Sequence, residues 1–298
     1  MFAPVSYAIA AAVLFYVALP VVGAFIVRGQ WRKFRTRLRQ ADGLPELPPG
    51  TASEGMPVKA FGAVDAIGGD DELWIRTDRV TFAVDMKGVP VYLVSDASDG
   101  RSESGEEDSV ERLAWSGLPA VSQGVRAFAA GRASVEAGKL VLGPLGKEPP
   151  LVILHSGDDG DVVVRAIRGG RHRNEYWNQL TQVSLAMGVL SMSGIVSLAL
   201  AGGSIPLVTA LVLAAAFSPL LPLLPPGLAA FMLYRRFWKR ARYFRARRDV
   251  AALRDPPDAM AVGWRYRALV STAASLASFA AGLAVNAWLV VVILRRIL

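Results

Sequence analysis

The chain has 298 residues, of which 53% are hydrophobic, and it is too apolar for an average soluble domain. It contains no cysteine, which excludes disulfides, thiol catalysis and thiolate metal sites. The net charge of +8 is unevenly distributed along the sequence, and this distribution predicts how the chain is placed.

Four long runs contain no Lys, Arg, Asp, Glu or His: residues 3–27, 180–201, 205–234 and 268–294. A bilayer core about 30 Å thick requires roughly 20 apolar helical residues, so each run is long enough to span it. We interpret residues 1–27 as a retained anchor, because the run is too long for a signal peptide and no basic region precedes it. The sequence therefore predicts a multi-pass membrane protein with four transmembrane helices.

Residues 28–57 are predicted to be a basic juxtamembrane segment followed by a linker. Residues 28–39 carry six basic and no acidic side chains, whereas residues 43–57 are rich in proline and glycine. Residues 40–168 have the opposite balance, with 21 acidic and 12 basic side chains. The basic residues are therefore concentrated next to the apolar runs.

Residues 58–168 are predicted to form a cytoplasmic all-β domain. Residues 79–86 alternate strictly between apolar and polar side chains, as in a half-buried strand. Further strands are expected at 58–67, 89–95, 124–135, 139–142, 151–155 and 161–167. Short strands between Gly/Asp-rich turns favour a small antiparallel barrel or sandwich, and an oligonucleotide/oligosaccharide-binding (OB) type of barrel is one form of it. The acidic, low-complexity segment 95–111 is predicted to be a disordered loop.

Few residues of this domain indicate chemistry. His155 closes an apolar strand, which favours a structural role, and the acidic turn at 156–161 lacks the spacing of an EF-hand loop. The sequence contains no G-x-S-x-G, Walker A, G-x-G-x-x-G or H-E-x-x-H motif. We predict no catalytic residue, no metal site and no cofactor, and we favour a protein that is not an enzyme.

Residues 169–179 are interpreted as an interfacial hinge between the β-domain and the second run. Tyr176 and Trp177 are residue types that anchor helices at a membrane interface. The alternative is a ligand-binding or catalytic pair made by His172 and Glu175, which would lie about one helical turn apart.

Residues 180–234 are predicted to be a transmembrane hairpin with an irregular second half. As one straight helix, residues 205–234 would be about 45 Å long, which exceeds the hydrocarbon thickness. A break is expected at four prolines, each of which lacks a backbone N–H: Pro219, Pro222, Pro225 and Pro226. We interpret the break as a packed kink; the alternative is a discontinuous helix that forms a binding or conduction site.

Residues 235–267 are predicted to be a basic amphipathic segment on the cytoplasmic side. Residues 235–248 carry eight basic and no acidic side chains, and Trp238 is expected to anchor them at the interface. The side chains expected to meet anionic lipid headgroups are Arg235, Arg236, Lys239, Arg240, Arg242 and Arg245. The simpler interpretation is a topology signal alone. Nucleic-acid binding is disfavoured, because the acidic domain would repel phosphate.

Residues 268–298 are predicted to be a transmembrane helix and a short tail. Small or amide side chains recur every four residues at Ala274, Ser278, Gly282 and Asn286. Small residues at this spacing allow two helices to approach closely, and an Asn can hydrogen-bond across the contact. The expected partner is either the second helix, through Ser184 and Gly188, or another copy of the chain.

Basic residues flank the end of the first run, the start of the second, the end of the third and the start of the fourth. Because Lys and Arg are enriched on the cytoplasmic side, these four ends are predicted to be cytoplasmic and the N-terminus to be outside. Only Arg295 and Arg296 do not fit this orientation, because they would lie on the outer side of the membrane. With an Arg- and Ala-rich composition, we expect a bacterial-type inner membrane protein.

The function expected from these features is that of a non-enzymatic scaffold or accessory subunit. It would present the β-domain to a protein partner, or to further copies of itself, near anionic lipid, and it would not bind nucleic acid. One alternative is a lipid-handling or permeation protein that uses the broken third helix. Another is a membrane enzyme with its site at the inner interface.

Overall fold

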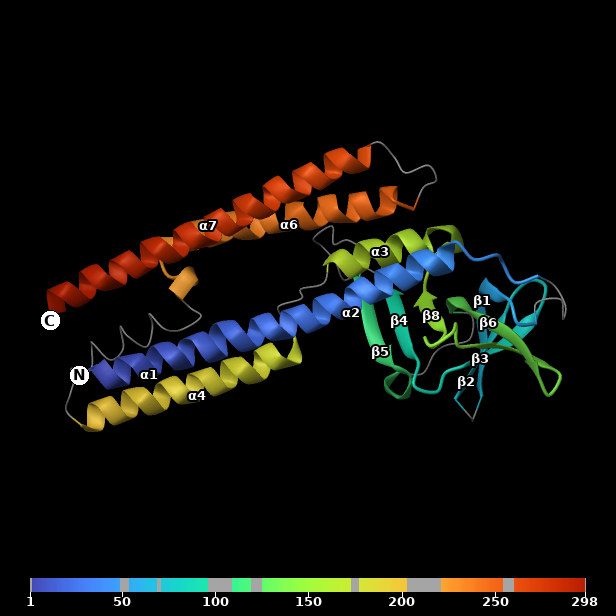
Figure 1. The fold of residues 1–298 in the computed structure, drawn as a ribbon, viewed down its shortest axis with the longest axis horizontal. Coiled ribbons are helices and arrows are strands. Elements are labelled where there is room, and N and C mark those ends of the chain that lie inside the picture. The colour runs from blue at the N-terminus through green and yellow to red at the C-terminus, as the bar shows by residue number, and fades with distance from the viewer. Residues whose placement is uncertain are drawn as a thin grey trace. The chain divides into compact units, whose positions relative to one another are not determined.

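The computed structural model describes residues 2–48, 54–68, 71–95, 109–118, 125–172, 177–202, 221–253 and 260–297. The chain divides into two compact units (Figure 1). The helical unit comprises Met1–Gln30, Asn174–Arg245 and Val262–Leu298. The barrel unit comprises Trp31–Arg173 and Ala246–Ala261.

Three described helical segments are long and apolar enough to cross a membrane: Tyr7–Asp42, Gln179–Leu198 and Met260–Ile293. The helices are α1 (Phe2–Val13), a π-helical stretch η1 (Leu14–Ala18), α2 (Leu19–Asp42), α4 (Gln179–Ala201), α6 (Gly227–Ala251) and α7 (Met260–Ile297). Most of the third predicted span lies outside the described residues, so the presence of four spans stays a prediction. The expected segment 235–267 is two helices, because α6 continues to Ala251 and α7 begins at Met260.

Within the helical unit, α4 packs against α1 and η1. Ser184 Oγ donates a hydrogen bond to the carbonyl oxygen of Phe15, and Gly188 faces the ring of Tyr16. A side chain at position 188 would overlap that ring, so glycine is required for the close approach. Ser184 and Gly188 therefore contact the first apolar run.

The barrel unit contains eight strands: β1 (Pro57–Gly68), β2 (Glu72–Arg76), β3 (Thr81–Asp85), β4 (Pro90–Ser95), β5 (Ser109–Ala114), β6 (Arg126–Glu136), β7 (Lys139–Gly143) and β8 (Leu151–His155). Five of them close into a barrel in the order β1-β2-β3-β7-β6, since β6 also pairs with β1. Strands β8, β4 and β5 extend the sheet from β6. The domain is thus a barrel with extra strands. It is not wholly antiparallel, because β3 pairs in parallel with β7 and β4 with β8.

Closure depends on β1, which pairs with two strands in turn. Its first part, Pro57–Ala63, lies antiparallel to β6, and its second part pairs with β2. At the changeover, a Cβ atom on Gly62 would lie 2.5 Å from the carbonyl oxygen of Arg76. A glycine in a strand allows this close approach of two backbones, so Gly62 lets β1 serve both neighbours.

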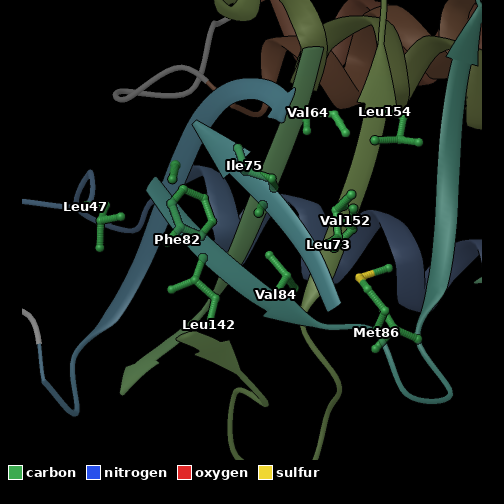
Figure 2. Packing of buried hydrophobic residues seen from close by; sticks show 14 of the residues in the cluster. Leu47, Val64, Leu73, Ile75, Phe82, Val84, Met86, Leu142, Val152 and Leu154 are labelled. Atoms are coloured by element: carbon green, nitrogen blue, oxygen red, sulfur yellow. The ribbon is translucent and has the colours of Figure 1, made fainter. Parts of the chain in front are cut away.

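The barrel core consists of buried aliphatic and aromatic side chains from most of the strands (Figure 2). Phe82, Val84 and Met86 point into it from β3 and the turn after it. Leu73 and Ile75 enter from β2, a strand that the sequence analysis did not predict. Strand alternation therefore places one face of each strand in a common core.

A helical layer packs on the β4–β5 extension. Helix α3 (Val162–His172) contacts both strands, so the expected strand at 161–167 is wrong. Val162, Val163, Ala166 and Ile167 are buried, which is the spacing of one helix face.

The C-terminal part of α2 also buries a side-chain face in the barrel unit. Trp31, Phe34 and Leu38 are buried, and the Phe34 ring stacks on Tyr92 of β4 with centroids 4.0 Å apart. The expected juxtamembrane segment 28–57 is therefore helical as far as Asp42. The expected loop 95–111 is shorter than predicted, because Ser95 belongs to β4 and residues 109–111 to β5. Residues 96–108 lie outside the described part of the chain.

Candidate functional site

Several arginine side chains of the barrel unit surround Asp249, near the end of α6. We call this group the arginine cluster: Asp249, Arg35 and Arg39 from α2, Arg171 from α3, and Arg248. Asp249 is only 2% exposed. Its Oδ2 accepts a hydrogen bond from Arg171 Nε at 2.6 Å, and its Oδ1 accepts from Arg248 Nη2 at 2.8 Å. Three helices thus converge on one carboxylate.

The two α2 arginines are farther from the carboxylate. Arg39 Nη2 lies 3.5 Å from Oδ1, and Arg35 Nε lies 3.9 Å from Oδ2. They are one helical turn apart, next to the buried residues Phe34 and Leu38, so packing of that apolar face directs them toward Asp249. A buried carboxylate is strongly unfavourable unless it is paired, and here it is paired repeatedly.

The electrostatics of the cluster favour an ionised Asp249. Burial raises the pKa of Asp249, but the positive charges and hydrogen bonds of Arg171 and Arg248 outweigh burial and hold the pKa below its ordinary value. A carboxylate of this kind does not act as a general acid at neutral pH. The cluster is therefore suited to fixing helix positions rather than to proton transfer.

This cluster was not predicted from the sequence, although the sequence contains one signal for it. Asp249 directly follows a segment, 235–248, with eight basic and no acidic side chains. A single acid at the end of such a segment is a candidate for a buried ion pair. Its partners on α2 and α3 are too distant in the sequence to be identified without the fold.

A second polar feature is a pocket of about 390 Å³ on the barrel. It is lined by Lys59, Arg76, Arg79, Arg126 and Asp159, among others. Much of this charge is internally paired, since Arg126 Nε donates to Asp159 Oδ1 at 2.9 Å. Arg76 lies 3.4 Å from the Asp65 carboxylate and Lys59 lies 3.7 Å from Asp42. The pocket offers hydrogen-bonding groups with a nearly balanced charge.

His155 lies beside this pair, with Nε2 at 3.5 Å from Asp159 Oδ1. It is buried, and neither ring nitrogen has a hydrogen-bond partner within geometric limits among the described residues. Burial lowers the pKa of His155, and the charge of Arg165 lowers it further, against the opposing effect of Asp159. The imidazole is therefore neutral near pH 7. The expected structural role of His155 stays a prediction, but its ring lacks the hydrogen bonds that such a role usually has.

The predicted lipid-facing side chains lie on α6. Arg235, Arg236, Lys239 and Arg240 are exposed along one face. Arg242 and Arg245 are half-buried, and their guanidinium carbons lie 5.8 Å and 5.5 Å from the centre of the Trp238 ring. Arg245 Nη2 also donates to Thr272 Oγ1 of α7 at 2.7 Å. We name the four exposed side chains the basic strip.

The predicted packing residues of α7 lie opposite the start of α6. Asn286 Oδ1 accepts a hydrogen bond from the backbone N–H of Gly227 at 3.1 Å. Its Nδ2 donates to the carbonyl oxygens of Leu221 and Leu224, the latter at 2.9 Å. Gly282 faces Ala230, where an added Cβ would lie 2.9 Å from the alanine methyl. Asn286 thus binds the polar backbone groups next to the proline break.

The remaining predicted residues are placed as follows. Ser278 Oγ donates to the carbonyl of Ala274 within α7, and both residues are half-buried. Trp177 is exposed just before α4. Pro225 and Pro226 precede α6. The placements of Pro219, Tyr176 and Glu175, and the side chains of Pro222 and His172, lie outside the described part of the structure.

In the described part of the chain, no group of three or more His, Asp or Glu side chains is placed to hold a metal ion. No protein-family model, curated protein or solved structure matches the chain. The function must therefore be inferred from the site itself.

Proposed function

We propose that the protein is a non-enzymatic membrane scaffold that holds its barrel at an anionic membrane surface and presents it to a protein partner. The arginine cluster is the observation that carries this proposal. It joins the end of α2, the end of α3 and the end of α6 within the barrel unit. These helix ends follow or precede the apolar runs closely in the sequence, so the cluster is suited to holding the barrel near the membrane.

The same proposal includes the membrane topology, the type of barrel and a contact with lipid headgroups. The chain would be a four-span protein of a bacterial inner membrane, with the N-terminus outside and the barrel in the cytoplasm. The barrel would be of the OB type, and its closed order with β3 parallel to β7 supports this. A fold of this type transfers no function, so we assign none from it. The basic strip would contact anionic headgroups.

The permeation hypothesis is based on the break before α6. The backbone groups that the structure describes at this break favour a packed kink instead. Irregular backbone at membrane depth requires polar partners. Asn286 supplies them to Gly227, Leu221 and Leu224. We therefore do not propose a conduction site there.

The test is purification of the full chain from its native membranes, followed by mass spectrometry of co-purifying proteins. Wild type is compared with Asp249→Ala and with Asp65→Ala, which removes a largely exposed ion pair of the same barrel unit. We expect one protein at stoichiometric yield with wild type and with Asp65→Ala, and a strong loss with Asp249→Ala. Recovery of lipid alone with wild type would refute the scaffold.

A further inference from the structure

Helices α6 and α7 pack antiparallel, and two contacts near the start of α6 fix their register. The backbone N–H of Gly227 donates to Asn286 Oδ1, and the centroids of the Tyr234 and Phe279 rings lie 5.2 Å apart. Seven residues forward along α6 are thus matched by seven residues back along α7. Figure 1 shows the two helices side by side.

This register places charge beside an apolar sequence. The basic strip is level with residues 272–278 of α7, which belong to the uncharged run 268–294. If that whole run were in hydrocarbon, Arg235 would lie about 14 Å inside it, at 1.5 Å per residue. Charged side chains at such depth are strongly unfavourable. The headgroup layer is therefore expected at the level of the basic strip, near Ser275.

Three features agree with a bilayer crossing at residues 275–294 of α7. As a helix this segment is about 30 Å long, which matches the hydrocarbon thickness. Trp238 of α6 is level with its first residues, and tryptophan favours the membrane interface. Arg295 and Arg296 follow it directly, so cations border the crossing at both ends. The crossing is thus shorter than the apolar run.

The preceding part of α7 then extends away from the bilayer. The helix is unbroken over Met260–Ile297, so residues 262–274 continue it beyond the crossing for about 20 Å. Helix α6 accompanies them, since the centroids of the Phe244 and Trp264 rings lie 5.8 Å apart. We call residues 262–274 the projecting segment.

The projecting segment buries one side and exposes the other. Ala268 and Ser271 are buried, and their spacing from Trp264 places them on the side that faces α6. The opposite side is apolar, and its first two side chains are 75% and 70% exposed. We call this side the outer face, and at the i, i+4, i+7 and i+8 spacing of one helix face it comprises Val262, Tyr266, Leu269 and Val270. An exposed apolar face outside the hydrocarbon is typical of a binding surface.

Charge indicates what covers the outer face. Exposed Arg265 and Arg267 lie on its two edges. Residues 228–248 and 260–298 contain no Asp or Glu, so the occupant must supply the negative charge. A second copy of this segment would bring like charges together, which is unfavourable. Val262 lies about 20 Å beyond the crossing, out of reach of lipid. An acidic protein surface is the occupant that fits.

We propose that the outer face docks an acidic amphipathic helix of a protein partner. The apolar side of that helix covers Val262, Tyr266 and Leu269, whose spacing is the one by which helices present anchors to a groove. Its carboxylates pair with Arg265 and Arg267. The proposal rests on the proposed membrane placement, and it adds to the scaffold a docking surface separate from the barrel.

The first measurement tests whether the segment projects. The chain contains no cysteine, so an introduced cysteine can carry a single environment-sensitive fluorophore. Gly263→Cys places it beside the outer face and leaves that face intact, because Gly263 is exposed and a Cβ there has open space in the described part of the chain. Trp288→Cys, at an exposed position of the crossing, is the reference for lipid. Both full chains are placed in nanodiscs of phosphatidylcholine.

We expect aqueous iodide to quench the probe at position 263, and spin-labelled lipid to quench the probe at position 288. Quenching of both probes by lipid would show that the segment does not leave the bilayer, and would overturn the proposal at this step.

The second measurement adds two synthetic helical peptides, each with leucines along one face. Glutamates flank the leucines in one peptide and lysines in the other. Only the glutamate peptide is expected to protect the probe at position 263 from iodide. Arg265→Glu, or an increase in salt, should weaken this protection, because both reduce the attraction between the peptide and the edges of the face.

Tyr266→Ser separates docking from general attraction to cations, since it leaves both flanking arginines in place. It should weaken the affinity for the glutamate peptide by about tenfold or more, as expected for an aromatic anchor. Tyr243→Ser is the matched control, because it makes the same change at an exposed position of α6 and should have little effect.

The proposal would be overturned by equal protection from the two peptides, by no protection from either, or by protection that Tyr266→Ser leaves unchanged. Shielding of position 263 without peptide, only in discs that hold two copies, would identify a second copy as the occupant instead. The co-purification test is separate, since Asp249→Ala acts on the barrel unit and Tyr266→Ser on the helical unit.

Discussion

The Asp249 carboxylate accepts a hydrogen bond from Arg171 Nε at 2.6 Å, although the two residues are 78 positions apart in the sequence. This contact joins α6 to α3, the helix that covers strands β4 and β5. Arg35 and Arg39 bring α2 to the same carboxylate. One side chain therefore holds three helix ends in the barrel unit.

Replacement of Asp249 by Asn is expected to destabilise the barrel unit by about 3–5 kcal/mol, the usual effect of removing one partner of a buried ion pair. The arginines would remain clustered without their counter-charge. The measurement is thermal unfolding of the purified chain in detergent. Asp65→Asn, in a largely exposed pair, should change stability by less than about 1 kcal/mol. Equal effects of the two substitutions would show that the cluster is not a clamp.

The depressed pKa of Asp249 gives the same experiment a pH dependence. The folded pKa of this carboxyl lies below its unfolded pKa. Such a group stabilises the folded chain at any pH above the unfolded pKa, and this stabilisation is lost as the pH falls through the folded pKa. Wild type should therefore lose more stability than Asp249→Asn on acidification below the ordinary range of Asp. If stability plotted against pH gave parallel curves for wild type and Asp249→Asn, the depressed pKa of Asp249 would be contradicted.

His155 predicts a second pH dependence with its own window. Its folded pKa is lowered, so the unfolded chain binds a proton first as the pH falls below the ordinary value of histidine. The stability of wild type should decrease from pH 7 downward until the folded pKa is reached. His155→Leu should remove this slope, and unfolding midpoints measured between neutral and mildly acidic pH test the prediction. An unchanged slope would show that His155 does not titrate differently on unfolding.

Asn286→Leu is expected to destabilise the helical unit by about 2 kcal/mol, because backbone groups of Gly227, Leu221 and Leu224 lose their partner. Ser278→Ala is the matched control on α7, since in the described part of the chain its hydroxyl donates to the carbonyl of Ala274 in the same helix. Thermal unfolding in detergent measures both. A larger loss for Ser278→Ala would contradict the assigned role of Asn286.

Phe34→Ala is expected to destabilise the barrel unit by about 3–5 kcal/mol. The side chain is fully buried and stacks on Tyr92. Lys33→Ala, at an exposed position of the same turn, should have little effect. Protease resistance of the barrel unit reports the difference, and similar digestion of the two variants would refute the packing.

The sequence predicted the local features best. The alternation at 79–86 indicated a strand whose apolar side enters a core, and Phe82, Val84 and Met86 are buried there. The three described membrane-length helices follow from their apolar runs alone. Such patterns depend on neighbours in the sequence, and these neighbours are visible without a fold.

The strand predicted at 161–167 was wrong because local composition and periodicity disagreed there. The β-branched residues at 162–164 favoured a strand, but Val162, Val163, Ala166 and Ile167 have the spacing of a helix face and are buried as one. The arginine cluster was missed for another reason. Its members come from three separate helices, and nothing local distinguishes Arg35 from its exposed neighbours.

The pairing of β1 with β6 has a consequence for how the chain is made. Pro57–Ala63 find their partners only when Arg126–Arg132 have been synthesised. At about 5–20 residues per second, β1 is without its partner for several seconds. During that time its apolar side chains are open to chaperones or to aggregation. The first hydrophobic run, residues 3–27, has therefore left the ribosome before the barrel can close.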